Sequence, residues 1–361
     1  MKVALIAITK HGIAHAQALQ AKHPAFELWV SEKQKDLAPG ASGTFATIKE
    51  FTATAWEKYD GLVYHVSLGA VVRTIAPFLK GKDVDPAVVT VDDGKRFAIS
   101  LLSGHVGGAN ELTEQVAAAL GCEPVVTTAS DARATLTVDI LGRELGWILE
   151  DKANVTPVSA AVVNERPVAV VQEAGEKNWW TRPTPLPSYI KVFGSVADAK
   201  KAGPFEAWLI ISDRSTEALI HDLGDVWSHT VVYRPKTLHL GIGCDAGADF
   251  DEVLGLVQGS LLDAGLSLKC AARIASIDLK AKEEALHQLS EWAAVPLVFY
   301  TRDELNGKKT LSVPNPIVMK YTGAIGVSEP AAMLSAGTDD LLIKKVKSKC
   351  ATLAVARKEF K

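Results

Sequence analysis

The stretch Gly61–Leu79, GLVYHVSLGAVVRTIAPFL, joins a buried strand to a helix and decides the fold class. Its first part, Gly61–Val66, is a short apolar run that predicts a strand, and Gly69–Leu79 has helical spacing. The same order occurs earlier, where Val3–Ile8 predicts a buried strand and Ile13–Leu19 the helix after it. Because alternating strands and helices favour a sheet of parallel strands, the sequence predicts an α/β fold.

The alternation continues beyond this stretch. Ala87–Asp92 and Phe97–Leu101 predict two strands around Asp93-Gly94, a dipeptide that is typical of tight turns and hairpins. Asn110–Leu120 then predicts a helix, which a glycine ends. Pro124–Thr127 predicts another strand, so the first third of the chain is expected to form one α/β sheet domain.

The last third repeats this pattern after a weaker middle region. Leu238–Ile242 predicts a strand and Phe250–Leu262 a helix, while Leu341–Val346 and Thr352–Ala356 predict an antiparallel hairpin. In the middle region, Val168–Val171 and Trp208–Ser212 predict strands, but the proline-rich stretch Trp179–Pro187 between them argues against regular structure there. We therefore predict two mixed, mostly parallel α/β sheet domains joined by a smaller, irregular α+β module. The predicted domains are residues 1–149, 150–234 and 235–361.

Composition excludes several classes of protein. The 39 Lys and Arg against 42 Asp and Glu leave a formal charge of −3, which argues against nucleic-acid binding through general electrostatics. The four cysteines form no CxxC pair, which suits a reducing cytosol, and no apolar run reaches the roughly 18 residues of a membrane span. His11 and His15 have metal-ligand spacing but are interpreted as an exposed helix surface. We predict a cytoplasmic protein.

The densest polar motif is Ser103–Glu111, SGHVGGANE, which comes directly before the predicted helix. Its glycines allow backbone N–H groups to approach a ligand, and a helix N-terminus favours a carboxylate or an oxyanion. His105 lies inside this loop, where an imidazole can act as a general acid or base near neutral pH. The alternative is that the glycines only shape a turn and that His105 is a surface residue.

A second polar loop, Thr127–Asp131, follows a predicted strand, and ligands often bind at the ends of parallel strands. Its hydroxyl groups and the Asp131 carboxylate are candidates for hydrogen bonds to a ligand. The structural alternative is that Ser130 or Asp131 caps a helix that runs through Val138 and Leu141. Both interpretations remain open from the sequence.

Two further motifs lie in the last third. Gly241–Ala246, GIGCDA, formally matches the GxGxxG/A pattern of dinucleotide-binding turns, but Asp278 is rather distant for the acidic partner that such sites use. A ligand-contacting turn between strand and helix is the broader interpretation. In Ser328-Glu329-Pro330, Ser328 is expected to cap a helix with Pro330 at its first position, which leaves Glu329 available for chemistry.

Five motifs occur in order along the chain: GAVVR at 69–73 with IAP at 75–77, DPAVV at 85–89, SGHVGGAN at 103–110, GIGC at 241–244 and SEPAA at 328–332. Together they resemble the CbiG family, the cobalt-precorrin-5A hydrolases of anaerobic cobalamin biosynthesis. The second domain departs from the family pattern, because Asp245 and Ala246 stand where family members often have two basic residues.

The resemblance implies a substrate and a reaction. The substrate is a ring-contracted cobalt tetrapyrrole, cobalt-precorrin-5A, whose δ-lactone joins the extruded carbon to a ring A acetate. Family members open this lactone with water and release acetaldehyde, which gives cobalt-precorrin-5B. Because the substrate carries the cobalt, no protein cofactor or metal is expected. The implied partners are the substrate and neighbouring enzymes of the pathway, with no nucleic acid or membrane.

Within this resemblance we assign roles as hypotheses. His105 is the base or proton shuttle, and Glu111 orients it or the water. Gly107, Gly108 and Asn110 supply oxyanion donors, and Arg73 pairs with a substrate carboxylate. The full predicted substrate-binding set is Arg73, Ser103, Gly104, Gly107, Gly108, Asn110, Thr127, Thr128, Asp131, Gly241, Gly243, Cys244, Ser328 and Glu329.

Two other functions remain open at this stage. The last third also resembles the stand-alone CobE family, which handles tetrapyrrole intermediates, so the whole chain would then be a non-catalytic carrier. A dinucleotide-dependent oxidoreductase is the third hypothesis, and it depends on the Gly241–Ala246 pattern alone. Acetaldehyde release distinguishes the hydrolase from the carrier, and binding of a nicotinamide cofactor would favour the oxidoreductase.

Overall fold

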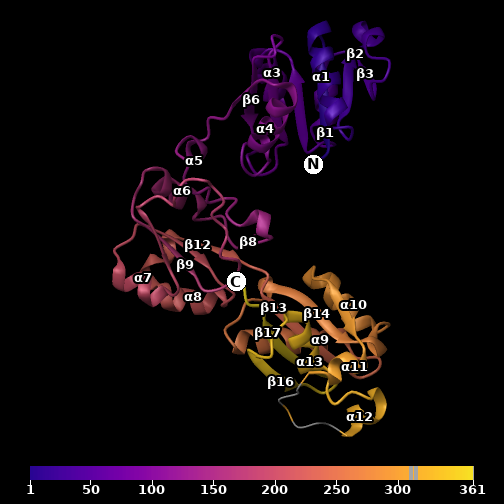
Figure 1. The fold of residues 1–361 in the computed structure, drawn as a ribbon, viewed down its shortest axis with the longest axis vertical. Coiled ribbons are helices and arrows are strands. Elements are labelled where there is room, and N and C mark those ends of the chain that lie inside the picture. The colour runs from indigo at the N-terminus through magenta and orange to yellow at the C-terminus, as the bar shows by residue number, and fades with distance from the viewer. Residues whose placement is uncertain (309–311, 313–315, 361) are drawn as a thin grey trace. The chain divides into compact units, whose positions relative to one another are not determined.

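The computed structural model describes residues 1–308, 312 and 316–360 of the chain (Figure 1). These residues divide into two compact units, 1–140 and 141–361, of which the second includes the undescribed positions. The described strands form one seven-stranded sheet in the first unit and two five-stranded sheets in the second. Most neighbouring strands are parallel, which confirms the predicted α/β class.

The first unit is built on a sheet of order β3-β2-β1-β4-β5-β6-β7. Helices α1 and α4 pack on one of its faces and α2 and α3 on the other, as the two separate apolar clusters show. The strands are β1 (Val3–Ala7), β2 (Glu27–Ser31), β3 (Gly43–Phe45), β4 (Gly61–His65), β5 (Ala87–Val91), β6 (Phe97–Leu102) and β7 (Glu123–Val125). The α-helices are α1 (Lys10–Lys22), α2 (Ile48–Ala55), α3 (Leu68–Ile75), α4 (Ala109–Leu120) and α5 (Ala129–Ala132).

Local signals explain where these helices begin and end. The Thr9 side chain accepts a hydrogen bond from the Gly12 N–H and caps α1. Helix α4 begins after Gly108 and ends before Gly121, and both glycines adopt left-handed backbone angles, with φ of 84° and 68°. Since a side chain strains this conformation, these two glycines set the length of α4.

One reversal of strand direction controls the geometry of the first unit. Strands β1 to β5 run parallel to their neighbours, whereas β6 is antiparallel to β5 and β7 is parallel to β6. The carboxyl ends of β6 and β7 therefore share one edge of the sheet, opposite the carboxyl ends of β1, β4 and β5. The loops after β6 and β7 meet at this edge.

The middle of the chain is more regular than the sequence predicts. It forms a sheet of order β10-β9-β11-β12-β8, in which every pair except β12 with β8 is parallel. Apolar runs in the sequence predict two of its strands, β9 and β11, whereas the patterns of β8, β10 and β12 are too weak to predict them. The elements are β8 (Ile148–Leu149), α6 (Val155–Val163), β9 (Val168–Gln172), β10 (Ile190–Phe193), α7 (Val196–Ala202), β11 (Ala207–Ile211), α8 (Thr216–Leu223) and β12 (Thr230–Arg234).

Strand β8 lies inside the predicted first domain, 1–149, but it pairs with β12 of the middle sheet. The division by contacts likewise falls earlier, between Ile140 and Leu141. The three predicted domain ranges remain predictions, with residues 148–149 associated by pairing with the middle module.

The last sheet has the order β15-β14-β13-β17-β16. Strands β16 and β17 are antiparallel, which confirms the predicted hairpin. The elements are β13 (Leu238–Cys244), α9 (Phe250–Asp263), β14 (Ala271–Ile277), α10 (Glu284–Ala293), β15 (Leu297–Tyr300), α11 (Arg302–Asn306), α12 (Pro316–Thr322), α13 (Ser328–Ala336), β16 (Ile343–Lys347) and β17 (Ala351–Arg357).

Candidate active site

The loop that carries His105 folds back onto the start of α4. The Ala109 N–H donates to the Ser103 carbonyl at 3.1 Å, and the Asn110 N–H donates to the Gly104 carbonyl at 3.0 Å. Ser103 adopts a left-handed backbone with φ of 58°, which is uncommon for a residue with a side chain. These two N–H groups at the start of α4 therefore bind carbonyls of the loop itself and are not open to a ligand.

Two glycines allow this close packing. A Cβ atom on Gly104 would lie 2.7 Å from Asn110 Oδ1, and one on Gly107 would lie 2.4 Å from Ser103 Cβ. Both distances are shorter than van der Waals contact, so any side chain would push the loop away from the neighbouring groups. Gly104 and Gly107 are therefore required for a steric reason, in addition to the backbone freedom that glycine provides.

The second predicted loop meets the first through Asn110. Its Nδ2 donates to Thr128 Oγ1 at 3.0 Å and to Asp131 Oδ2 at 2.8 Å, while Ser100 Oγ donates to its Oδ1 at 2.7 Å. Thr128 Oγ1 in turn donates to Asp131 Oδ2 at 2.6 Å. The two loops that the sequence singled out thus form one polar cluster, because β6 and β7 end at the same edge of the sheet.

His105 lies between two carboxylates in this cluster. Its Nε2 is 3.2 Å from Asp131 Oδ2 and 3.1 Å from Ser130 Oγ, and its Nδ1 is 3.4 Å from Asp139 Oδ1. The imidazole keeps 20% of its surface exposed, so a ligand can reach it. A hydroxyl and a carboxylate on opposite ring nitrogens give the order of groups found in hydroxyl–imidazole–carboxylate relays.

The two carboxylates keep His105 protonated. The hydrogen bond to Asp131, followed by the one to Asp139, raises the pKa of His105 to about 9 against the opposing effect of burial. Burial would raise the pKa of Asp139, but its hydrogen bond to His105 and the imidazolium charge lower it below the ordinary value. At neutral pH His105 is therefore an imidazolium, held between Asp131 and the ionised Asp139, and it is a proton donor rather than a ready base.

The predicted oxyanion donors divide into two groups. The Gly108 N–H donates to the His105 carbonyl at 3.1 Å and the Asn110 N–H to the Gly104 carbonyl, so neither is open to a substrate in this conformation. The Gly107 N–H has no partner among the described residues. The Ser103 hydroxyl is buried and likewise has no described partner.

Three predicted residues of the first unit lie apart from this cluster. Glu111 is exposed in the first turn of α4, and the carboxylates that flank His105 are Asp131 and Asp139. Arg73 is exposed on α3, where its Nη1 donates to the Gly69 carbonyl at 3.0 Å. Thr127 is exposed just after β7. Their roles toward a substrate stay predictions.

The expected helix through Val138 and Leu141 is not formed. The helix that follows β7 is the four-residue α5, its N-cap is Thr128 rather than Ser130 or Asp131, and residues 138–140 form turns. The short helix lets the chain turn back, and this return places Asp139 beside His105. The alternative of a simple helix cap is therefore wrong, and Ser130 and Asp131 point their side chains into the cluster instead.

The glycines of the last third lie inside strand β13 rather than in a turn. A Cβ on Gly241 would lie 1.9 Å from the Ser328 carbonyl, because α13 packs directly against the strand there. Gly243 faces Thr352, whose Oγ1 would be 2.9 Å from such a Cβ. Burial raises the pKa of the Cys244 thiol to about 11, so it stays protonated. The pattern thus has a packing reason: Gly241 and Gly243 lie inside β13, whereas the glycines of a dinucleotide site lie in the turn between the strand and the helix, which here is the segment between β13 and α9.

Helix α13 also differs from its prediction. It begins at Ser328 with Val327 as N-cap, so Ser328 is not the cap and Pro330 is not the first helical residue. Glu329 is buried, and its carboxylate accepts hydrogen bonds from the Ser312 N–H at 2.9 Å, the Ser312 hydroxyl at 2.7 Å and the Lys345 N–H at 3.1 Å. These contacts give Glu329 a structural role in tying segments together.

Sequence analysis missed two members of the cluster. Asp139 lies in the segment LTVDI, which has no motif, and Ser130 was noticed only as part of a polar loop and a possible cap. Neither has a local signal that links it to His105. The one sequence signal that points to Ser130 is its position next to Asp131 in the loop after a strand.

The fold and this cluster define an α/β protein with a histidine–carboxylate site in its first unit. The sequence matches three family domains in order: "Cobalamin synthesis G N-terminal" over residues 50–131, "Cobalamin biosynthesis central region" over 136–235 and "Cobalamin synthesis G C-terminus" over 238–356. The chain belongs to the CbiG family, whose members act in cobalamin synthesis.

Several curated proteins resemble this chain. The cobalt-precorrin-5A hydrolase of Priestia megaterium is 42% identical, covering 98% of this chain and 94% of that protein. The cobalt-precorrin-5A hydrolase of Salmonella typhimurium is 30% identical, covering 92% and 91%. Protein CobE of a Sinorhizobium species is 38% identical over 33% of this chain and 79% of its own length.

No helix in the described part of the chain is long and apolar enough to cross a membrane.

Proposed function

We propose that this protein is a cobalt-precorrin-5A hydrolase, which opens the δ-lactone of the ring-contracted cobalt tetrapyrrole and releases acetaldehyde to give cobalt-precorrin-5B. The likeness to hydrolases of that name along nearly the whole chain supports this proposal. The single structural observation that carries it is the cationic His105 held between Asp131 and Asp139 at a partly exposed loop.

In the first step, water adds to the lactone carbonyl carbon and the bond from that carbon to the ring oxygen breaks. The departing alkoxide takes the Nε2 proton of His105, while the proton that water loses goes to solvent. An imidazolium suits this role, because it can protonate a poor leaving group and becomes a neutral imidazole when it does so. The open Gly107 N–H is the proposed donor to the oxyanion that forms on the carbonyl oxygen when water adds.

In the second step, the new carbinol returns its proton to the now neutral His105. The carbon–carbon bond to the macrocycle breaks, acetaldehyde leaves, and the electron pair stays on the macrocycle carbon, which takes a proton from solvent. One histidine thus acts first as acid and then as base, and it ends in its starting protonation state. Of the two roles in our hypothesis, the raised pKa favours the proton shuttle over the simple base.

The proposal places no cofactor on the protein, because the substrate carries the cobalt. The substrate and neighbouring cobalamin-pathway enzymes are the proposed partners, and the cytoplasm is the proposed location. Asp131 and Asp139 act as positioning residues: they hold the imidazole in place and keep it charged.

The test is to mix the protein with cobalt-precorrin-5A and to measure acetaldehyde by an alcohol-dehydrogenase-coupled assay, together with the mass change of the tetrapyrrole. Stoichiometric acetaldehyde, together with a product whose mass equals that of the substrate plus one water minus one acetaldehyde, would support the hydrolase. Binding without acetaldehyde would instead favour the carrier, which the likeness of the last third to CobE makes the second candidate.

A further inference from the structure

A cavity of about 450 Å³ opens in the second unit, at the carboxyl ends of β9 and β10. Phe193 and Phe360 give it apolar walls, and Lys177, Arg357 and Lys358 give it cationic groups. Its volume falls within the range of about 300–1,000 Å³ that is usual for small-molecule sites. It lies in a different part of the chain from the His105 cluster and takes no part in the steps described above.

The strand order makes this position significant. The chain leaves β9 to form β10 on one side and later returns to form β11 on the other side of β9. Because the connection after β9 leads to β10 and the connection after β11 leads to β12 on the opposite side, the topological switch point lies between β9 and β11. The cavity lies next to this point, since it is lined by residues that directly follow β9 and β10, including Glu173 and Gly194.

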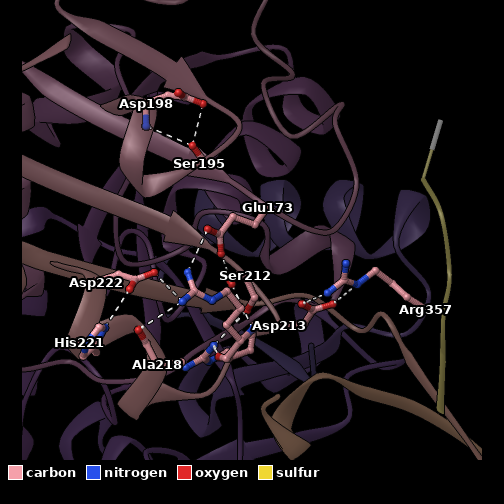
Figure 2. Close-up of polar contacts among 11 residues, drawn as sticks. Glu173, Ser195, Asp198, Ser212, Asp213, Ala218, His221, Asp222 and Arg357 are labelled. Atoms are coloured by element: carbon pink, nitrogen blue, oxygen red, sulfur yellow. Dashed lines mark hydrogen bonds and ion pairs between the residues drawn. The ribbon is translucent and has the colours of Figure 1, made fainter. Parts of the chain in front are cut away.

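Arg357, at the end of β17, is held rigidly beside this cavity. Its Nε and Nη2 donate to the two carboxylate oxygens of Asp213, each at 2.7 Å (Figure 2). Asp213 is 1% exposed and also accepts a hydrogen bond from Thr237 Oγ1 at 2.9 Å, so its position is set by the interior. One side of the guanidinium is therefore clamped in a fixed orientation.

The other side of the same guanidinium is available. The Arg357 side chain is 36% exposed, and its Nη1 has no hydrogen-bond partner among the described residues. A guanidinium that is already oriented loses little conformational entropy when it binds a carboxylate, and its planar N–H groups match the carboxylate oxygens. The structure thus presents a pre-oriented anion receptor at the cavity wall.

The remaining charges around the cavity favour an anion. The Glu173 carboxylate is already engaged, since it accepts from Ser212 Oγ at 2.6 Å and lies 3.4 Å from Arg214 Nη1 (Figure 2). Glu359 is exposed and is the opposing charge, against the exposed lysines 177 and 358. Lys358 Nζ lies 5.0 Å from the centroid of the Phe360 ring, which leaves its charge unpaired among the described residues, so the charges outside ion pairs sum to a net positive value.

We propose that this cavity is a binding subsite for a carboxylate on a flat, apolar ligand, with Arg357 as the main donor and Phe193 and Phe360 as the apolar walls. This assignment rests on the proposed function for the identity of the ligand, which is the carboxylate-bearing edge of the tetrapyrrole. The cavity accommodates one edge of such a macrocycle rather than the whole ring system.

The experiment measures binding of cobalt uroporphyrin, a planar polycarboxylate tetrapyrrole, to the full-length protein by quenching of tryptophan fluorescence. Arg357→Lys keeps a positive charge beside Asp213 but loses the planar set of donors, and we expect it to raise Kd about tenfold. Lys177→Ala with Lys358→Ala leaves the Asp213 contact untouched, and we expect an increase in Kd of a few fold that disappears at high salt. Lys282→Ala, an exposed lysine outside the cavity lining, is the control with unchanged Kd.

Unchanged Kd in both the Arg357 and the double lysine variants would overturn the subsite. Because Arg357→Lys can also loosen the junction with Asp213, the double lysine variant gives a result that does not depend on that contact. The same variants are assayed for acetaldehyde formation from cobalt-precorrin-5A. If the wild-type protein forms no acetaldehyde but the variants bind the probe more weakly than it does, the subsite is kept and the hydrolase is rejected. If every variant has normal turnover with unaltered KM and Kd, the hydrolase is kept and the subsite is rejected.

Discussion

The His105 loop of the first unit and the Gly241 strand of the last third carry similar sequence patterns but have different structures. Both combine closely spaced glycines with a polar residue next to a helix. In the first, the glycines shape a partly exposed loop whose histidine lies within 3.4 Å of two carboxylates. In the second, Gly241 lies within a strand and lets α13 approach to a distance that no side chain permits.

The difference shows how the same residue types serve chemistry or packing. What separates the two regions is whether titratable groups stay accessible after folding. His105 keeps an exposed edge and has a raised pKa, whereas Glu329 is buried and its carboxylate accepts hydrogen bonds from neighbouring segments. Cys244 is half-buried, and its raised pKa keeps the thiol protonated. The comparison can be tested by substitutions that separate activity from stability.

The largest effect is expected for His105→Gln. Loss of the proton shuttle should lower kcat by about 10²–10⁴-fold, the usual contribution of a general acid or base, with a small change in thermal unfolding. Acetaldehyde release and the melting temperature are measured on the same sample, with His11→Gln, an exposed histidine of α1, as the matched control. Wild-type turnover by the His105 variant would remove the histidine from the mechanism.

Next in size is Gly241→Ala, which tests the packing side of the comparison. The added Cβ would collide with the Ser328 carbonyl, so we expect a loss of about 1–3 kcal/mol in the free energy of unfolding, as for other overpacked cores. Gly255→Ala, on an exposed face of α9 with open space around it, should stabilise by roughly 0.5–1 kcal/mol. Urea unfolding distinguishes the two, and equal stability would contradict the packing argument.

Glu329→Gln addresses the buried carboxylate. It removes the charged acceptor of the Ser312 and Lys345 donors, and we expect a loss of about 1–2 kcal/mol in stability. The kcat of the folded variant should be unchanged at a temperature where it is fully native. If kcat fell while the unfolding midpoint stayed constant, Glu329 would belong to the chemistry after all.

The smallest effect concerns pH. Since His105 acts as an acid, kcat/KM should fall as the pH rises through about 9, the pKa of His105 in the folded protein. Because this pKa lies above the ordinary 6.5, the stability that the proton provides is complete below about 6.5 and is lost as the pH approaches and passes 9.

Asp139→Asn tests the cause of this pH dependence. Without that charge and ionic hydrogen bond, the pKa of His105 should drop, so the alkaline limb of kcat/KM should move down by about 1 unit. Glu111→Gln, which changes an exposed carboxylate nearby in the sequence, is the control and should leave the limb in place. A limb that moves with Glu111 but not with Asp139 would restore the original assignment of the orienting carboxylate.

Much of the fold follows from local sequence patterns. The strand at 61–65, the hairpin around Asp93-Gly94, and the helix that Gly121 ends all have strong period or turn signals, and each is found where it was predicted. The missed strands are short ones, such as β3, β8, β10 and β12, in which two to five residues give too few positions to define a period.

The candidate site was predictable only in part. His105 and Asp131 are predictable because each lies in a polar loop directly after a strand, a position that is typical of ligand sites in α/β folds. Asp139 has no such context, and Glu111 was chosen in its place because it is close to His105 in the sequence. Proximity along the chain misled here, since the first turn of α4 directs Glu111 to solvent.

The sequence by itself determined the alternation of strands and helices, the glycine frame of the His105 loop and the family motifs, because each depends on residues that are neighbours in the chain. Only the tertiary structure decided that His105 is an imidazolium between Asp131 and Asp139, and that Arg357 is clamped by Asp213. A pKa and the orientation of a guanidinium depend on distances between groups that are far apart in sequence. Those distances are set by strand direction and packing.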